Sequence, residues 1–187
     1  GLIGVEVAVE ALRVVGVSLT GQVLCAAEEA LIGTKPEDVC RQTARLVART
    51  YAQLQQRSIA LTGVGVGLPG ALDEATGMLR FAPNLGWRNV DFLPMITQAL
   101  AQAKVPEVPV HVQNEADTAA LSEYEFADGD AHDSLIFVTC GAGVGAGIVI
   151  NDRLFTGKQG MAGEIGHSTL QIDGPLCSCG RKGCAET

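Results

Sequence analysis

The order of strand-like and helix-like segments narrows the possible folds of this chain most sharply. Three short runs with the character of strands come first, at Leu2–Ala8, Leu12–Ser18 and Gln22–Ala27. The turn Leu19-Thr20-Gly21 joins the second run to the third, and Gly21 supplies the positive φ that a hairpin turn requires. Helical and strand-like segments then alternate. The order predicts an antiparallel meander that continues into parallel strands, which is an α/β fold.

The later segments carry their own start and stop signals. Thr34 and Glu37 have the spacing of a capping box, Pro36 occupies the first turn, and apolar residues recur at helical spacing as far as Leu54. We expect the further elements in this order: a strand at Leu61–Leu68, a loop from Pro69, a helix from about Asp91 to Ala101, a strand at Val108–Val112 and a helix at Glu115–Phe126.

The pattern restarts after Gly129-Asp130. Leu135–Thr139 and Gly145–Ile150 form a strand, a Gly-rich turn and a second strand, as at the beginning of the chain. We therefore place a lobe boundary at Gly129–Asp133, which divides the chain into a first lobe (1–130) and the start of a second (131–187). The chain does not begin with Met and ends directly after a motif, so we expect a complete first lobe and a truncated second one.

Composition excludes several classes of function. The 187 residues are 47% hydrophobic and 18% charged, as in a folded globular chain. The net charge of −8 opposes nucleic-acid binding by this segment, because phosphate contacts need a basic face. No apolar run is long enough to span a membrane, and no signal peptide is recognisable. Three crowded cysteines and three in apolar stretches are typical of an intracellular, cytoplasmic protein with one metal site.

The most specific motif is a histidine followed by a cysteine-rich loop. Its members are His167, Cys177, Cys179 and Cys184. One imidazole and three thiolates can form a closed tetrahedral zinc site, in which the metal shapes the loop and leaves no open position to activate water. A disulfide or reduced surface thiols are the alternative interpretations.

Three further motifs are weaker. The Gly-rich run Gly141–Gly147 can cradle phosphate with backbone amides, or simply allow two strands to approach closely. In Gln113–Asp117, Glu115 is either a base at a ligand-binding sheet edge or a charge that favours a helix N-terminus. Asn84 and Trp87 suit a sugar, although a loop Trp that covers the core is an equal alternative.

Together and in this order, these motifs resemble the ROK family, which groups sugar kinases with sugar-responsive repressors. The most specific marks are Gly163–His167, the cysteine loop ending in Gly183-Cys184-Ala185-Glu186, and the run Thr139–Gly147. The resemblance covers the whole chain and implies the actin-like (ribonuclease-H-like) ATPase fold, in which sugar binds between two lobes. It implies sugar contacts from Gly70, Asn84, Asn114, Glu115, Glu164, His167 and Glu186.

The phosphate-binding positions of the family are altered here. Family kinases open with an Asp-x-Gly-Gly-Thr turn, whereas this chain has Glu6-Val7-Ala8-Val9-Glu10. Without the glycines the backbone cannot approach a phosphate, and the glutamates add like charge. Glu115 replaces the catalytic Asp of the kinases, which displaces the carboxylate by about 1.5 Å, and Ala142 replaces a Thr hydroxyl.

Sugar positions are kept while phosphate positions are lost, which indicates a sugar sensor without phosphotransfer and not an enzyme. The resemblance is strongest to xylose-repressor-type regulators, in Asn114-Glu115-Ala116 and in the opening Gly4-Val5-Glu6. Such proteins carry a winged helix-turn-helix before this region, so we expect operator DNA to be bound by a domain absent from this chain, in a homodimer. The alternative is an ATP-dependent sugar kinase of the glucokinase or N-acetylhexosamine kinase type.

Overall fold

The chain is built around one mixed sheet with helices on both faces. The computed structural model describes residues 1–126 and 133–187. The five strands of the sheet, in spatial order, are β3 (Val23–Ala30), β2 (Ala11–Val17), β1 (Leu2–Val7), β4 (Gly63–Leu68) and β8 (Val110–Asn114). β1, β2 and β3 pair as an antiparallel meander, whereas β4 and β8 continue from β1 in parallel. The meander and its transition into parallel strands are confirmed, as is the hairpin turn with Gly21 at φ 81°.

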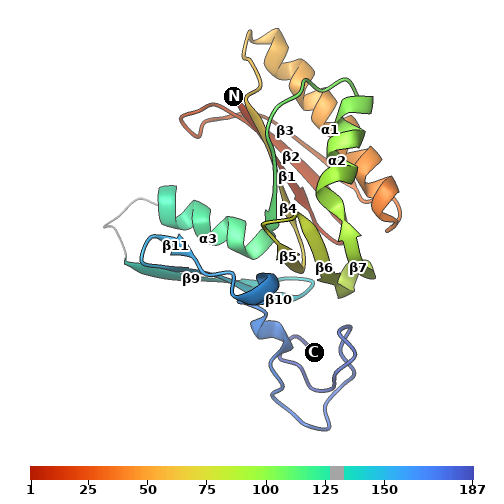
Figure 1. The fold of residues 1–187 in the computed structure, drawn as a ribbon, viewed down its shortest axis with the longest axis vertical. Coiled ribbons are helices and arrows are strands. Elements are labelled where there is room, and N and C mark those ends of the chain that lie inside the picture. Colours follow the sequence, from red (N-terminus) through yellow and green to blue (C-terminus); the bar gives the residue numbers. More distant parts are fainter. Residues whose placement is uncertain (127–132) are drawn as a thin grey trace.

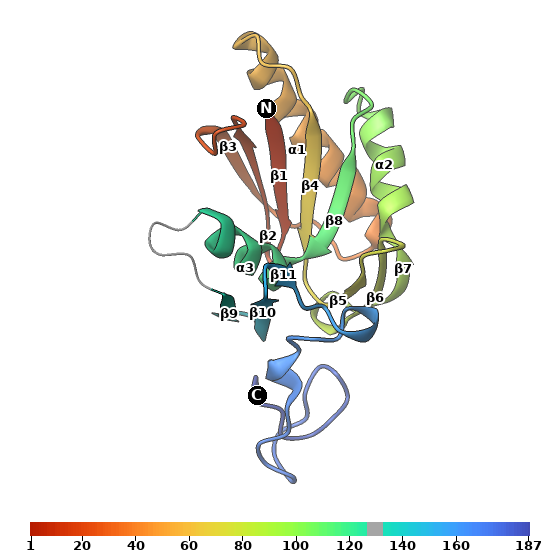
Figure 2. The same cartoon turned by 60° about the vertical axis from the view of Figure 1, so that its left-hand side comes forward.

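Two helices cover one face of this sheet (Figures 1 and 2). They are α1 (Pro36–Gln56) and α2 (Phe92–Gln102), which pack against each other. Leu46 and Leu54 of α1 are fully buried against strand residues such as Val14. Burial of each large apolar side chain stabilises the fold by about 1.5–3 kcal/mol.

The predicted capping box at the start of α1 is wrong. Lys35 is the N-cap residue, and no side chain caps the helix. Pro36 restricts the residue before it to extended backbone, and Lys35 accordingly has φ −73° and ψ 132°. The helix therefore begins at Pro36, one residue later than a Thr34 cap would allow. The Thr34 carbonyl instead accepts a hydrogen bond from Trp87 Nε1.

The segment expected as a loop after Pro69 is a small antiparallel sheet. Its strands are β5 (Ala71–Asp73), β6 (Met78–Ala82) and β7 (Trp87–Asp91), with a short 3-10 turn at Pro83–Leu85. The strands are too short to show alternation, which is why the sequence pattern missed them. The turn glycines Gly77, directly before β6, and Gly86, directly before β7, were the available signal.

A smaller antiparallel sheet follows the main sheet in the chain. Helix α3 (Glu115–Phe126) packs on β9 (Ser134–Cys140) and β10 (Val144–Ile150), and β10 pairs with β9 on one side and with the short β11 (Arg153–Leu154) on the other. Figures 1 and 2 show α3 beside this smaller sheet, on the opposite side of the main sheet from α1. The expected lobe boundary at Gly129–Asp133 falls almost wholly on 127–132, outside the described residues.

The rest of the chain contains little regular structure. Two 3-10 turns, Lys158–Gly160 and Ile165–His167, lead into the cysteine loop, which projects from the end of the molecule in Figure 1. Across residues 1–126 and 133–187, none of the helices has the length and apolar character needed to cross a membrane.

Candidate functional site

A cleft of about 480 Å³ lies between the main sheet and the β9–β10 sheet. The ends of parallel strands β4 and β8 open into it, which is where open α/β sheets hold ligands. The structure brings all seven residues expected to contact sugar to this one cleft. They are Gly70, Asn84, Asn114, Glu115, Glu164, His167 and Glu186.

Asn114 fixes the wall of the cleft. Its Oδ1 accepts hydrogen bonds from the backbone N–H groups of Ala116 (2.8 Å) and Asp117 (3.1 Å), so it caps helix α3. Its Nδ2 donates to the Gly70 carbonyl at 2.8 Å. Gly70 has φ 96°, and a Cβ there would lie 2.2 Å from the Phe81 carbonyl oxygen, so only glycine fits. Asn114 thus positions the Gly70 turn and keeps one N–H free for a ligand.

Glu164 and His167 come from one 3-10 turn and line the same part of the cleft. The spacing of three residues places both side chains on one face, and His167 Nε2 lies 3.7 Å from Glu164 Oε2. Burial raises the pKa of the Glu164 carboxyl, the His167 ring lowers it and Glu186 raises it. The pair offers a ligand one carboxyl group and one ring nitrogen.

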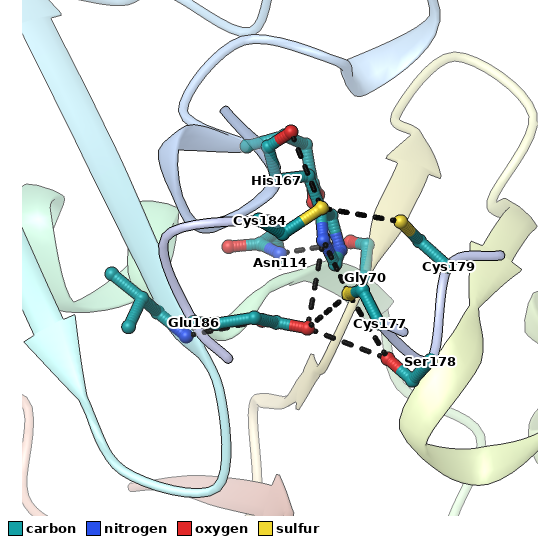
Figure 3. Close-up of polar contacts among 10 residues, drawn as sticks. Gly70, Asn114, His167, Cys177, Ser178, Cys179, Cys184 and Glu186 are labelled. Carbon is teal, nitrogen blue, oxygen red and sulfur yellow. Dashed lines mark hydrogen bonds and ion pairs between the residues drawn. The ribbon is translucent and has the colours of Figure 1, made fainter. Parts of the chain in front are cut away.

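Glu186 connects the cleft to the cysteine loop (Figure 3). Its side chain is 9% exposed, and its Oε1 lies 3.1 Å from Cys177 Sγ and 3.5 Å from His167 Nδ1. Its Oε2 accepts from the backbone N–H of Val144 at 3.4 Å. One carboxylate therefore joins the loop, the histidine and the start of β10.

The four residues of the His–Cys motif form one cluster that could bind a metal ion. The ligand atoms of His167, Cys177, Cys179 and Cys184 lie within 4.8 Å of one another. Cys177 Sγ is 3.6 Å from His167 Nδ1, and Cys179 Sγ is 3.7 Å from Cys184 Sγ. The thiols are free in the structure. Nδ1 of the ring faces Cys177 and Nε2 faces Glu164, so one ring nitrogen is directed to the cluster and the other to the cleft.

The opposite end of the cleft is acidic and partly self-neutralised. Glu6 of β1 lines it and pairs with Arg13 of β2 at 3.1 Å. Glu115 lines the same cleft, and burial raises the pKa of its carboxyl, with Glu6 adding to the rise. Glu10, at the β1–β2 turn, is exposed. Sequence analysis missed Arg13, although its place opposite Glu6 in a two-strand register was a usable signal.

The Gly-rich turn is shorter than the motif. Only Gly141-Ala142-Gly143 connects β9 to β10, because Gly145 and Gly147 belong to strand β10. The turn lines the cleft, and the N–H groups at its two ends have partners: the Gly141 N–H donates to the Gly143 carbonyl at 2.9 Å, and the Val144 N–H of β10 donates to Glu186 at 3.4 Å.

Trp87 lies in the core and not in the cleft. It is 3% exposed and stacks on Phe92 with ring centroids 6.0 Å apart.

Asp117 is a buried carboxyl that sequence analysis did not assign to the site. It is 5% exposed, and burial raises its pKa to about 7, with Glu74 and Glu164 contributing.

Comparison with known proteins finds one family and relatives of two kinds. Residues 2–187 match the ROK family. A xylose repressor from Caldicellulosiruptor bescii is 32% identical over 186 residues, which are 99% of this chain and 45% of the repressor. A glucokinase from Thermotoga maritima is 34% identical over 187 residues, which are 99% of this chain and 56% of the glucokinase.

A solved structure supports the same relationship. It is that of a ROK family transcriptional regulator, a homologue of the E. coli MLC protein. It matches with a TM-score of 0.82 and 25% identity, covering 99% of this chain and 45% of that one. The expected actin-like ATPase fold is confirmed. The chain spans about half the length of the curated relatives it matches.

Proposed function

The chain belongs to the ROK family, and on that premise we propose that it is the sugar-sensing part of a transcriptional repressor of carbohydrate-utilisation genes, without phosphotransfer. One observation carries the proposal. The cleft gathers at one end the side chains that are expected to contact sugar, while its other end carries the Glu6–Arg13 ion pair, and the N–H groups of Gly141 and Val144 already have hydrogen-bond partners. The relatedness to xylose repressors supports this choice within a family of repressors and kinases.

In the sugar end, we assign the hydroxyl contacts to Asn84, Glu115, Glu164, Glu186 and the Nε2 of His167. Carboxylates and amides can each bridge neighbouring hydroxyls, and an epimer with a misplaced hydroxyl leaves a buried polar group unpaired. Gly70 and Asn114 would shape the wall against which the ring lies, with the second N–H of Asn114 as a further donor.

The nucleotide end opposes phosphates in two ways. Glu6 adds a carboxylate to the cleft, and its ion pair with Arg13 engages the cation that a phosphate would need. The Val144 amide is turned towards Glu186, and Ala142 has no hydroxyl to offer. Like charges and occupied donors together disfavour a polyphosphate in this cleft.

We further propose that the His–Cys cluster holds a structural zinc ion. Zinc bonds of about 2.3 Å to sulfur and 2.0–2.1 Å to nitrogen give tetrahedral edges of about 3.8 Å between sulfurs and about 3.6 Å between sulfur and nitrogen. The separations of 3.7 Å for Cys179–Cys184 and 3.6 Å for Cys177–His167 match these edges. A zinc at Nδ1 would fix the tautomer of His167, so that Nε2 carries the proton it donates to a sugar hydroxyl.

The remaining steps concern the whole protein. Operator DNA would be held by a winged helix-turn-helix outside this chain, in a cytoplasmic homodimer. Sugar that closes the cleft would reorient the paired DNA-binding domains and weaken operator binding. The sugar must then favour the closed form by a coupling energy of about 1–3 kcal/mol.

A second candidate is an ATP-dependent sugar kinase of the glucokinase or N-acetylhexosamine kinase type. The glucokinase relative and the raised pKa of Glu115, which suits a general base, favour it. Titration of the zinc-loaded protein with MgATP, with sugar present, separates the two candidates. The sensor shows no MgATP binding and no ADP formation, whereas a kinase shows both.

The direct test of the repressor proposal is a gel-retardation assay of the full-length protein on DNA upstream of its own gene. We expect a retarded band that one sugar of a panel releases. Retention of the same operator affinity with every sugar would contradict the sensing role, and absence of any retardation at low salt would favour the kinase.

A further inference from the structure

A second cavity lies behind the sugar cleft. It measures about 230 Å³ and is bounded by the β5–β6 strands on one side and the cysteine loop on the other. Its lining residues are Ala71, Phe81, Arg88, Met161, Glu164, His167, Cys179 and Arg181. Glu164 and His167 also line the first cleft, so they form a wall between the two cavities.

Two arginines that have no carboxylate partner in the described part of the chain line this cavity. Arg88 lies over the Phe81 ring, with its Cζ 4.2 Å from the ring centroid. Arg181 lies beside the Cys179 thiol in the loop. Among residues 1–126 and 133–187, neither guanidinium has a carboxylate within 4.0 Å, whereas five other arginines of the chain do. The aromatic contact orients the Arg88 guanidinium and leaves its N–H edge available.

The charge of this cavity is opposite to that of the sugar cleft. Glu164 is the one carboxylate among its described lining residues, against the two guanidinium groups. In a chain of net charge −8, two guanidinium groups that have no carboxylate partner among the described residues reverse the local charge in one concave site, and the Arg181 guanidinium contacts the Cys179 sulfur. Guanidinium groups bind phosphate and carboxylate oxygens through pairs of N–H donors, and such charge-assisted hydrogen bonds are about twice as strong as neutral ones.

We propose that this cavity binds the oxyanion group, phosphate or carboxylate, of a small metabolite, held by Arg88 and Arg181. The volume suits a group of that size and is too small for a nucleotide. The site is separate from the sugar cleft and does not depend on whether the protein is a sensor or a kinase. Its shared wall places the anion next to Glu164 and His167.

Isothermal titration of the zinc-loaded protein with inorganic phosphate, at fixed ionic strength, tests the proposal. We expect a Kd of about 1 mM or tighter. Arg88→Gln and Arg181→Gln each weaken the affinity at least tenfold. Arg57→Gln is the matched control, because Arg57 is also exposed and without a carboxylate within 4.0 Å in the described part of the chain, but lies at the end of α1. We expect Arg57→Gln to leave the affinity for phosphate unchanged.

Zinc content is measured for each variant, because Arg181 adjoins a cysteine of the metal cluster. If Arg181→Gln loses zinc, Arg88→Gln decides the result. A parallel titration with succinate distinguishes a carboxylate from a phosphate ligand. The proposal is overturned if neither anion binds below 10 mM, or if Arg88→Gln binds both as tightly as the unaltered protein. Sugar titrations of the same samples report on the sensing role independently.

Discussion

Asn114→Ala should destabilise the protein more than any ordinary loop substitution, because one side chain holds two structures together. Loss of the helix cap on α3 costs about 1 kcal/mol. Loss of the donor to the Gly70 carbonyl leaves a partly buried acceptor unpaired, which costs about 1–3 kcal/mol. The free energy of unfolding should therefore fall by about 2–4 kcal/mol, which corresponds to roughly 5–15 °C in the midpoint of thermal unfolding.

Asn114→Ser separates the two contributions. A serine hydroxyl can still accept from the α3 amides, but it is too short to reach Gly70. We expect this variant to recover about 1 kcal/mol relative to Asn114→Ala. Urea unfolding followed by the fluorescence of the buried Trp87, the single tryptophan of the chain, measures all three proteins.

Sugar binding should weaken in both Asn114 variants, since both release the Gly70 turn that lines the cleft. If the free energy of unfolding of Asn114→Ala lies within about 0.5 kcal/mol of that of the unaltered protein, the two contributions are refuted, because ordinary surface substitutions change stability by no more than that. Equal stability of the Ser and Ala variants would show that the hydroxyl does not cap α3.

Three further predictions concern the metal, the buried acid and the sugar wall. Cys184→Ser should abolish binding of one zinc per chain, measured by atomic emission, and lower the unfolding midpoint, whereas Cys140→Ser, on an exposed strand position, should change neither. The pKa of Asp117 is raised to about 7, so its folded form holds a proton that the unfolded chain releases above about pH 4. Its contribution to stability is lost as pH rises through 7, and Asp117→Asn should raise the unfolding midpoint at pH 8 but hardly at pH 4. Glu164→Gln should weaken sugar binding at least tenfold in calorimetry while zinc content stays at one; loss of zinc would show that Glu164 supports the metal loop instead.

The fold was predictable where the chain makes long, regular segments. The three opening strands, α2 and α3 lie within about three residues of their expected bounds, because their apolar periodicity matches the sheet and helix faces they bury. The small β5–β7 sheet was not, since strands of three to five residues carry no measurable period. The capping box at Thr34 was a wrong prediction because Pro36 keeps Lys35 in extended backbone and makes Lys35 the N-cap residue.

The site was predictable as a set of residues but not as a set of contacts. All seven expected sugar-binding residues line one cleft, which the family resemblance implied. The sequence could not show that the Asn114 side chain makes three hydrogen bonds to the protein backbone. It also could not show that the Gly-rich turn is only three residues long. Both depend on how strands far apart in the chain are registered against each other.

The position of Glu186 connects the proposed metal site to the proposed sugar cleft. Its carboxylate contacts the Val144 amide at the edge of the cleft with one oxygen and the Cys177–His167 side of the metal cluster with the other. A sugar hydroxyl that binds the Glu186 carboxylate would therefore change its contacts with the Val144 N–H and with Cys177 and His167. A zinc ion bound by the loop would prevent the loop alone from absorbing that adjustment, which would then pass to the start of β10. A metal-free loop would absorb it, so sugar binding and its effect on the second lobe should become uncoupled when zinc is removed.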